Sequence, residues 1–336
     1  SRARNFTYPR IMIPSGGTSG KLKFCVHSPD TLAASVQSLF RFHHEKPLSS
    51  INPLPVFHVS GWMPIMRACL TGGTVRLATW KDLEQGDYPR TVGNHCSLSL
   101  VPTQLARLVR TEAGLRFLHG FDSIYIGGAA PSPVLVNTIR TEKLPALFVY
   151  GSTETASMVI AGTRADSDSS GSLWGSPLPG VEAELSDEQE LIVRSPSLFR
   201  GYFPEDSPVE AWPTGDIARR LSDGNLQVIG RKDYLINTGG EKVNPEEVEA
   251  ALSDCLPGSD FAVGSESDLE WGQRVVALVG RNLSPEEMKS LFEKLSEKLA
   301  PYKIPKRILP VEHIPRTLSG KINRAEVRHL LSSPGS

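Results

Sequence analysis

Apolar residues in the first half of the chain follow two alternating patterns. Short, nearly continuous apolar runs are separated by longer stretches in which apolar residues recur at helical spacing. Parallel strands that are buried on both faces and joined by crossover helices produce this alternation. We therefore expect an α/β sheet between residues 30 and 150. Its predicted helices are 31–42 and 102–109, and its predicted strands are 75–78, 98–101, 123–126 and 147–150.

The pattern changes twice further along the chain. Between residues 172 and 230, short apolar segments alternate with many turn residues, which favours a β subdomain. After Gly230, helical spacing returns around a pair of strands, which is typical of a compact α+β unit of about 100 residues. The expected strands are 182–185, 191–194, 226–229, 260–263 and 274–280, and the expected helices are 245–253 and 285–299.

A polar Arg-Lys-Asp segment at 231–233 separates the last two patterns, and we place a domain boundary there. The predicted fold class is α/β, with a large N-terminal body of mixed sheets and helices over residues 1–230 and a small C-terminal α+β domain over residues 231–336. Length agrees with this division, because 336 residues exceed the usual size of one domain.

Composition excludes several classes of protein. The 36 basic and 37 acidic residues give a formal net charge of -1, so charge implies no nucleic acid or other polyionic partner. Apolar runs stay shorter than the roughly 18 to 20 residues that a membrane span needs, and the first ten residues carry no apolar signal core, so we expect a cytoplasmic protein. The 4 cysteines are far apart, which argues against a disulfide framework and a structural zinc site.

The segment 14–24, PSGGTSGKLKF, has the composition of a phosphate-binding loop. Glycines let backbone N–H groups converge on phosphate oxygens, hydroxyls add donors, and a lysine adds charge. The Walker pattern does not fit, because its first glycine would fall on Ser15 and because Leu22 follows Lys21. Alternating apolar residues from Leu22 onward predict a strand, so the loop belongs to a hairpin. An ordinary Gly/Ser hairpin turn is the alternative.

Two segments follow predicted strands at the sheet edge where ligands bind in α/β proteins. In Tyr150-Gly151-Ser152-Thr153-Glu154, the threonine can bond a phosphate oxygen, the carboxylate can hold Mg²⁺, and the tyrosine can stack on a base. A structural strand-to-helix cap is the alternative there. The second segment, GGAAP at 127–131, exposes backbone that a purine can lie against, or else forms a tight turn before a helix.

Two weaker segments gain meaning only beside these. Asp216 in Thr-Gly-Asp and Arg231, fifteen positions later, could grip the two hydroxyls of a ribose, although such a pair is normally solvated. Lys321 ends PRTLSGK at 315–321, where a glycine turn can carry a mobile positive charge into a distant site. A basic, solvated tail is the alternative for that segment.

In order, these segments and GRKDYLINTGGEKVNPEEVE at 230–249 resemble the adenylate-forming superfamily of acyl-CoA synthetases, adenylation domains and luciferases. The resemblance covers essentially the whole chain. It implies a ligase that uses ATP, Mg²⁺ and CoA: a carboxylate attacks the α-phosphate to give an acyl-adenylate, and the CoA thiol then displaces AMP. The protein mainly positions groups and neutralises charge growing at phosphorus.

The resemblance also assigns roles to residues of this chain. Lys321 would bridge the carboxylate and α-phosphate oxygens, and Asp233 would be the hinge about which the C-terminal domain rotates as a lid. Its rotation would bring the Gly239-Gly240 loop to the CoA tunnel. The implied ATP contacts are Ser15, Gly16, Gly17, Thr18, Ser19, Gly20 and Lys21 for the β- and γ-phosphates, Thr153 for the α-phosphate, Glu154 for Mg²⁺, Gly128, Ala129, Ala130, Tyr150 and Gly151 around the adenine, and Asp216 with Arg231 for the ribose.

Two features depart from the family pattern. Leu22 stands where the loop usually has proline, which alters the hairpin but removes no phosphate donor. Only 14 residues precede Ser15, whereas the family carries a substantial N-terminal region there, so a minimal or truncated member is expected.

The segment after residue 54 indicates the acid. His58 matches the family position that lines the acyl pocket, and Arg67 comes seven residues after Ser60 on an otherwise apolar helix. A buried arginine needs an anion, either a substrate carboxylate or a structural Asp or Glu. This arrangement resembles the o-succinylbenzoate:CoA ligases of menaquinone and phylloquinone synthesis, whose acid has a second carboxylate. Arg67 would bind the carboxylate that is not activated, or the ring-attached one, with Ser60 and Ser157 nearby.

Two other functions stay open on sequence alone. The chain could be a CoA ligase for another aryl or medium-chain acid, in which Arg67 is structural. It could also be a nucleotide-binding module without catalysis. The oligomeric state is left open as well, with a homodimer as one option.

Overall fold

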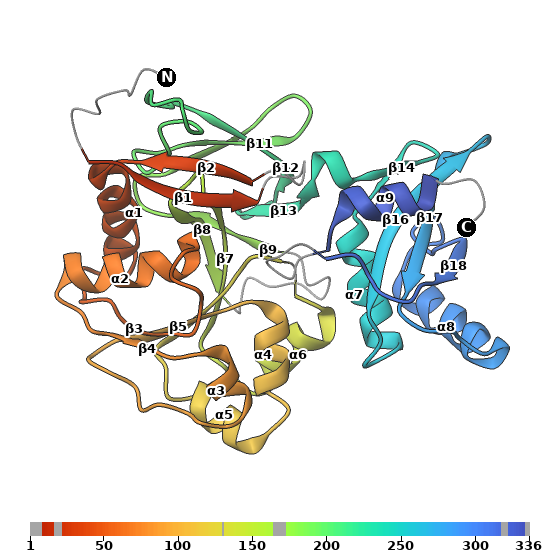
Figure 1. The fold of residues 1–336 in the computed structure, drawn as a ribbon, viewed down its shortest axis with the longest axis horizontal. Coiled ribbons are helices and arrows are strands. Elements are labelled where there is room, and N and C mark those ends of the chain that lie inside the picture. Colours follow the sequence, from red (N-terminus) through yellow and green to blue (C-terminus); the bar gives the residue numbers. More distant parts are fainter. Residues whose placement is uncertain (1–8, 17–21, 130, 164–172, 317–321, 333–336) are drawn as a thin grey trace.

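The computed structural model describes residues 9–16, 22–129, 131–163, 173–316 and 322–332. Figure 1 shows a larger body, coloured red to green, beside a smaller one, coloured cyan to blue. Each body has its own sheet and its own buried apolar clusters. No helix in these ranges is both long and apolar enough to cross a membrane.

Within the described residues, eleven strands form the large sheet in the order β10-β11-β12-β13-β9-β8-β7-β6-β5-β3-β4. The part from β4 to β7 is parallel, and the remainder is antiparallel. The parallel strands are β3 (Ser49–Asn52), β4 (Val75–Leu77), β5 (Cys96–Leu100), β6 (Ser123–Ile126) and β7 (Ala146–Ser152). The antiparallel strands are β8 (Ser157–Thr163), β9 (Leu173–Pro177), β10 (Glu182–Leu185), β11 (Glu190–Arg194), β12 (Trp212–Arg220) and β13 (Leu226–Arg231).

Helices cover both faces of the parallel part (Figure 1). Leu98, Ile124 and Ile126 point to one face, where they pack with residues of α4, α5 and α6. On the other face, α1 and α2 pack on each other. The helices of this body are α1 (Pro29–Phe42), α2 (Val59–Thr71), α3 (Trp80–Glu84), α4 (Pro102–Leu108), α5 (Glu112–Leu118) and α6 (Pro133–Thr141).

The predicted phosphate-loop hairpin is confirmed on either side of residues 17–21, which lie outside the described residues. Strand β1 (Ile11–Gly16) pairs antiparallel with β2 (Leu22–His27). An apolar cluster fixes this hairpin to the body, since Ile13 packs with Leu32 of α1, Met63 of α2 and Ala156 of the turn after β7. The hairpin is therefore anchored beside the carboxyl ends of the parallel strands.

The smaller body contains a second sheet, in the order β15-β14-β17-β16, with β18 paired to β17. Its apolar cluster joins this sheet to α7 and α8, while α9 packs on β16. Its elements are β14 (Ile236–Thr238), β15 (Glu241–Val243), α7 (Pro245–Cys255), β16 (Phe261–Asp268), β17 (Gly272–Val279), α8 (Pro285–Lys298), β18 (Arg307–Pro310) and α9 (Arg324–Ser332), and the 3-10 helix η2 (Lys232–Tyr234) leads into it.

Most predicted elements are present within a few residues of their expected bounds, and β6 and β10 agree at both ends. One alternative is wrong: the segment after Tyr150 is no helix cap, because β7 turns directly into the antiparallel strand β8. The turn after β6 does precede a helix, although Ser132 caps it and Pro133 occupies its first turn. Sequence patterns did not predict β3, β8, β9, β12, β14, β15, β18, α3, α5, α6 or α9.

Candidate active site

Glu154 lies at the centre of the candidate nucleotide site. It sits in the turn between β7 and β8 and is 8% exposed. Its Oε1 accepts hydrogen bonds from Ser15 Oγ of the hairpin at 3.0 Å and from the Tyr202 hydroxyl at 2.8 Å. Two predicted site residues from distant parts of the chain are thus in direct contact, whereas Gly17, Thr18, Ser19, Gly20 and Lys21 lie outside the described residues.

The environment of Glu154 favours a charged carboxylate. Burial raises its pKa, but hydrogen bonds from Tyr202, from backbone and from Ser152 and Ser15 outweigh burial, so the pKa is lower than its ordinary value. Proteins hold Mg²⁺ through one or two carboxylates together with substrate phosphates. An ionised carboxylate beside the phosphate hairpin fits that chemistry, because hydroxyl donors orient one oxygen and leave lone pairs for a cation.

Backbone around Thr153 is held by a histidine that no motif marked. His27 is completely buried on β2, and its Nε2 donates to the Thr153 carbonyl oxygen at 2.8 Å. Its Nδ1 lies 3.0 Å from Thr31 Oγ1. Burial lowers the pKa of His27, which keeps the ring neutral at pH 7. The hairpin and the turn that carries Thr153 are therefore linked by a buried hydrogen bond.

The predicted ribose pair lies at one position of the β12–β13 ladder. Asp216 and Arg231 are directly opposite each other, with 3.8 Å between Asp216 Oδ1 and Arg231 Nε. The Tyr150 hydroxyl donates to Asp216 Oδ2 at 2.6 Å, and Arg231 Nη1 donates to the Thr214 carbonyl at 2.7 Å. Gly215 leaves room for the guanidinium, since a Cβ there would lie 2.8 Å from Arg231 Nη2.

Charge at this ladder position is partly desolvated. Burial raises the pKa of Asp216, while the Tyr150 hydrogen bond and the Arg231 charge oppose that rise. Burial and the nearby Asp216 carboxylate raise the pKa of Tyr150 well above its ordinary value, so its hydroxyl stays a donor. The alternative of a merely solvated Asp and Arg is not what the structure shows.

The predicted adenine segment follows β6, the strand next to β7. Gly128 has φ of 85° and, like Ala129, is exposed, so the backbone there is accessible. Gly151 has no room for a side chain, because a Cβ would lie 2.0 Å from the Ser157 carbonyl oxygen. Ala130 lies outside the described residues.

Arg67 is buried on α2 and is 5% exposed. Its Nη2 donates to Ser157 Oγ at 3.0 Å, which confirms that Ser157 lies nearby, and its Nε is buried without a hydrogen-bond partner. Burial lowers its pKa to about 10, so the side chain is still charged at pH 7. Across the described ranges, no Asp or Glu oxygen lies within 4.0 Å of the guanidinium, so the structural salt bridge considered above is not found.

Other predicted acid-site residues belong to the start of the same helix. His58 is the N-cap of α2, and Ser60 is exposed in its first turn. Seven residues are about two helical turns, so Ser60 and Arg67 share one side of α2. Gly61 allows this helix start to pack closely, because a Cβ there would lie 2.2 Å from the Pro55 carbonyl oxygen.

Residues predicted for the second half-reaction lie on the smaller body. Asp233 is exposed in η2, between β13 and β14. Gly239 and Gly240 form the turn between β14 and β15 with φ of 59° and 86°, and a Cβ on Gly239 would lie 2.4 Å from the Trp271 ring. Lys321 lies outside the described residues.

The basic residues near the C-terminus are not simply solvated. Arg324 forms a bidentate ion pair with Glu249, at 2.6 and 2.8 Å. Arg307 forms an ion pair with Glu266, and Lys303 forms one with Glu247. These contacts hold α9, β18 and the segment before β18 to the small sheet and to α7. A solvated basic tail is therefore wrong for these three residues on either side of PRTLSGK, whereas residues 317–321 of that motif lie outside the described residues.

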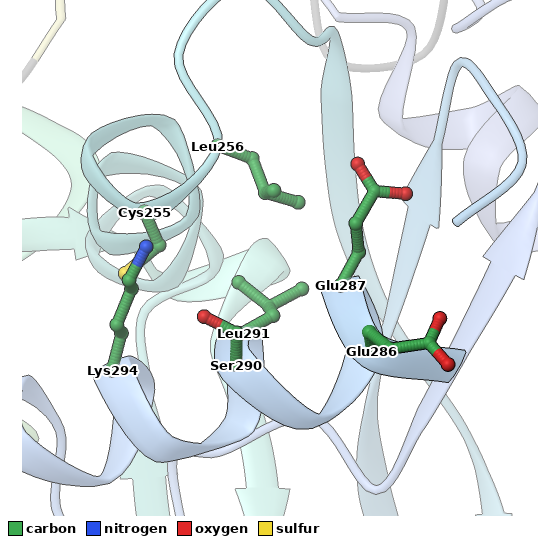
Figure 2. Close-up of a pocket in the computed structure, with 7 residues that line it drawn as sticks. All are labelled: Cys255, Leu256, Glu286, Glu287, Ser290, Leu291 and Lys294. Atoms are coloured by element: carbon green, nitrogen blue, oxygen red, sulfur yellow. The ribbon is translucent and has the colours of Figure 1, made fainter. Parts of the chain in front are cut away.

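Figure 2 shows a hollow between α7 and α8 in the smaller body. None of the predicted site residues that the structure describes lines it. The lining residues are Cys255, Leu256, Glu286, Glu287, Ser290, Leu291 and Lys294. The candidate site therefore consists of the side chains that contact Glu154, Asp216 and Arg67. The hollow between α7 and α8 is not part of it.

Tyr202 and His27 are the site residues that sequence reasoning missed. His27 shares its side of β2 with Lys23 and lies on the side opposite the apolar Leu22, so the alternation that predicted the strand gave no sign that His27 is buried. Tyr202 follows a glycine in a segment with no regular pattern, and its contact with Glu154 spans 48 positions. No local signal identifies such a contact.

Comparisons relate this chain to known proteins. A family model described as AMP-binding enzyme matches residues 7–203, and one described as AMP-binding enzyme C-terminal domain matches residues 247–321. The 2-succinylbenzoate–CoA ligase of Listeria monocytogenes is 30% identical over 325 residues, which cover 94% of this chain and 68% of that protein.

Solved structures give the same picture. The o-succinylbenzoate CoA synthetase (MenE) of Bacillus subtilis, in complex with the acyl-adenylate intermediate OSB-AMP, is 26% identical with a TM-score of 0.80, covering 94% of this chain and 68% of that chain. The same enzyme in complex with ATP and magnesium ion, at 24% identity and a TM-score of 0.77, covers 94% of this chain and 69% of that chain and shares the fold.

Proposed function

The chain belongs to the AMP-binding enzyme family, and on that premise we propose that it is an AMP-forming acid-thiol ligase that converts 2-succinylbenzoate to its CoA thioester. The acid carboxylate attacks the α-phosphate of ATP and releases pyrophosphate, and the CoA thiol then attacks the acyl carbon and releases AMP. A relative named for this activity is 30% identical, and a solved relative holds the corresponding acyl-adenylate. The thioester would feed menaquinone or phylloquinone synthesis.

The described residues account for much of the nucleotide binding in this proposal. Asp216, oriented by Tyr150, accepts hydrogen bonds from the ribose hydroxyls, and Thr153 donates to the α-phosphate. Glu154 holds Mg²⁺, which neutralises phosphate charge when bound. These groups are fixed before substrate arrives, by the Ser15 and Tyr202 bonds to Glu154 and by the Tyr150 bond to Asp216. Preorganised charge of this kind lowers the barrier to phosphoryl chemistry.

The observation that carries the choice of acid is the guanidinium of Arg67. A buried charge without a counter-ion costs several kcal/mol, of order 3 to 5 when one partner of a buried pair is missing. Arg67 has a hydroxyl partner in Ser157 but no carboxylate partner among the described residues. A substrate carboxylate that is not activated supplies the missing anion, and 2-succinylbenzoate has two carboxylates.

The division into a binding body and a lid is part of the same proposal. Residues 1–230 bind ATP and the acid, and residues 231–336 turn about Asp233 between the half-reactions. Exposure of Asp233 supports a hinge there, because a solvated side chain tolerates two orientations. Lys321 stabilises the adenylation transition state, and the Gly239-Gly240 turn faces CoA after rotation.

The test measures ATP–pyrophosphate exchange with a panel of acids: 2-succinylbenzoate, benzoate, phenylacetate and a medium-chain fatty acid. We expect exchange to be fastest with 2-succinylbenzoate and to fall at least tenfold in Arg67→Ala, about the loss of one charge-assisted hydrogen bond. The exposed Arg76 provides the matched control, Arg76→Ala. Unchanged turnover of 2-succinylbenzoate in Arg67→Ala would show that another acid is the substrate, and absence of exchange with every acid would favour a non-catalytic nucleotide-binding module.

A second variant separates the half-reactions. Lys321→Ala should abolish adenylation but spare thioester formation from supplied acyl-adenylate, because its charge is needed only at the α-phosphate. Equal loss of both steps would contradict this role.

The proposal also includes a cytoplasmic location, where ATP and CoA are available. Fractionation of cells, with an antibody to the chain, would test this location.

A further inference from the structure

Glu190 binds the backbone of the turn that carries the proposed ribose carboxylate. It is the first residue of β11, and its side chain is 19% exposed. Its Oε1 accepts a hydrogen bond from Gly215 N at 3.1 Å. Gly215 directly precedes Asp216, so a carboxylate that no site motif marked is bonded to the residue next to a predicted nucleotide contact.

The register of β11 and β12 explains why this backbone N–H bonds a side chain. Between two paired positions, the single residue Leu191 of β11 is opposite residues 214–216 of β12, which form a bulge. Extra residues in a β-bulge leave the ladder, and bulges beside active sites redirect side chains. Glu190 Oε1 supplies an acceptor for Gly215 N in place of the ladder.

Thr214 fixes the two ends of the same bulge. Its Oγ1 donates to the Leu191 carbonyl oxygen at 2.9 Å and accepts from Asp216 N at 3.1 Å. Gly215 lies between them with φ of 75°, in the left-handed region that glycine adopts without strain. The bond from Gly215 N to Glu190 therefore holds the middle of the bulge, which is the part with no side chain of its own.

Glu190 is itself held in place before any ligand binds. Its backbone N donates to Ser186 Oγ at 3.1 Å, and its carbonyl oxygen accepts from Ser186 N at 2.9 Å. The second carboxylate oxygen, Oε2, lies 3.4 Å from Lys232 Nζ, and Lys232 also pairs with Glu188. Both carboxylate oxygens of Glu190 thus have a partner, which limits rotation of the side chain.

We propose that Glu190 is a positioning residue for the nucleotide: its bond to Gly215 N holds the 214–216 bulge so that the Asp216 carboxylate meets the ribose hydroxyls. Glu190 acts through the backbone and does not touch the nucleotide. Two hydrogen bonds to one ribose require a fixed carboxylate, and a bulge that can relax loses that geometry. This inference deepens the proposed function and rests on it, since it presumes that Asp216 binds the ribose.

The bond to Gly215 N, rather than the ion pair with Lys232, is expected to carry the effect. The Lys232 side chain is 44% exposed, and exposed ion pairs contribute little. A carboxylate that accepts from a backbone N–H forms a charge-assisted hydrogen bond, which is stronger than a bond between neutral groups. Loss of the acceptor should therefore matter more than loss of the lysine.

The experiment measures the binding of ATP and of 2′-deoxy-ATP by isothermal titration calorimetry without acid, together with KM and kcat in pyrophosphate release. Glu190→Met keeps the length of the side chain and removes the acceptor. It should weaken ATP binding about fivefold to tenfold, the effect of one hydrogen bond, and reduce the preference for ATP over 2′-deoxy-ATP about threefold. We expect an unchanged KM for 2-succinylbenzoate and a kcat within about twofold of wild type.

Three further variants make the outcome specific. Glu190→Gln keeps an acceptor for Gly215 N but loses the charge that pairs with Lys232, so it should restore most of the ATP affinity. Glu188→Ala and Lys232→Met remove ion pairs and leave the Glu190 bond to Gly215 N in place, so they should not change ATP binding. Thermal unfolding of each variant checks that the fold is intact, and Glu190→Ala carries the test if Glu190→Met does not fold.

Asp216→Ala distinguishes failure of this inference from failure of the proposed function. If Asp216→Ala abolishes the preference for ATP over 2′-deoxy-ATP while Glu190→Met keeps it, the positioning role is refuted and the ribose assignment stands. Equal losses for the two nucleotides in Glu190→Met, or an equal loss in Lys232→Met, would also refute the positioning role. If Asp216→Ala leaves the preference unchanged, the ribose assignment in the proposed function fails, and this inference fails with it.

Discussion

The hydrogen bond from Tyr150 to Asp216 gives the sharpest test of the nucleotide site. Tyr150→Phe removes one hydroxyl and keeps the ring that is proposed to face adenine. In the structure this hydroxyl lies 2.6 Å from Asp216 Oδ2, at the ladder position where Arg231 is opposite. The change therefore frees the carboxylate without altering its charge partner.

The expected loss follows from the charge and burial of Asp216. Hydrogen bonds to charged groups contribute about 1.5 to 3 kcal/mol. The Asp216 side chain is 15% exposed and the Arg231 side chain 33%, so solvent screens part of the interaction and the lower end applies. About 1.5 kcal/mol corresponds to roughly a tenfold fall in kcat/KM for ATP. The pKa of Asp216 should also rise, since the lost donor favoured the ionised form. As the pH is lowered, ATP binding by Tyr150→Phe should therefore begin to weaken at a higher pH than ATP binding by wild type.

The assay measures kcat/KM for ATP and for 2′-deoxy-ATP by pyrophosphate release. A carboxylate that accepts hydrogen bonds from both ribose hydroxyls makes wild type prefer ATP over 2′-deoxy-ATP. Tyr150→Phe should reduce that preference, because a misplaced Asp216 carboxylate loses less binding to a nucleotide that offers only one hydroxyl. Tyr302→Phe, on the smaller body, is the matched control. An unchanged kcat/KM for ATP together with an unchanged preference would refute the assignment of Asp216 to the ribose.

Three predictions concern stability. Gly151→Ala should destabilise the fold by about 2 kcal/mol, measured by urea unfolding, because its Cβ would lie 2.0 Å from a backbone oxygen of β8; an unchanged midpoint would contradict the tight turn. Arg324→Met should cost about 3 to 5 kcal/mol because it leaves Glu249 largely buried and unpaired. Arg281→Met at an exposed pair should leave the urea midpoint nearly unchanged. His43 has a pKa of about 4 in the folded protein against 6.5 when unfolded. Its contribution to the free energy of unfolding is therefore complete above pH 6.5 and is lost as the pH falls toward 4. Discounted for partial exposure, this is about 2 kcal/mol, and His43→Gln should flatten the free energy of unfolding over that range.

Local chemistry made part of the site predictable. The β1–β2 hairpin follows from glycines beside an alternating strand, and β6 follows from an apolar run that ends at a glycine turn. Asp216 and Arg231 were expected to pair across one short strand at 226–229, and the β12–β13 ladder does place them opposite each other. In each case the deciding contact is close in sequence, so residue pattern alone carries the information.

Contacts that depend on sheet order were not predictable in this way. Arg67 meets Ser157 across 90 positions, and Ser15 meets Glu154 across 139. The alternation Cys-Ser-Leu-Ser-Leu in β5 suggests a strand with one solvated face, yet both of its serines are partly buried. Only the register of the sheet shows that Ser97 lies between Ser50 of β3 and Ser123 of β6, which are both buried.

The turn from Ser152 to Ser157 carries residues of both the nucleotide site and the acid site, and its backbone is held rigidly. Thr155 is completely buried, and its Oγ1 accepts from Ser152 N at 2.9 Å and lies 2.6 Å from the Ser157 carbonyl oxygen. Ala156 and Ser157 have positive φ of 52° and 93°, a conformation that costs non-glycine residues of order 1 to 3 kcal/mol and is kept where the surroundings enforce it. Glu154 lies at the start of this turn and Ser157 at its end, so one strained segment faces the phosphate hairpin on one side and Arg67 on the other. Under the proposed function, the acid carboxylate and the α-phosphate must meet between these points, and a turn that cannot relax keeps them in register.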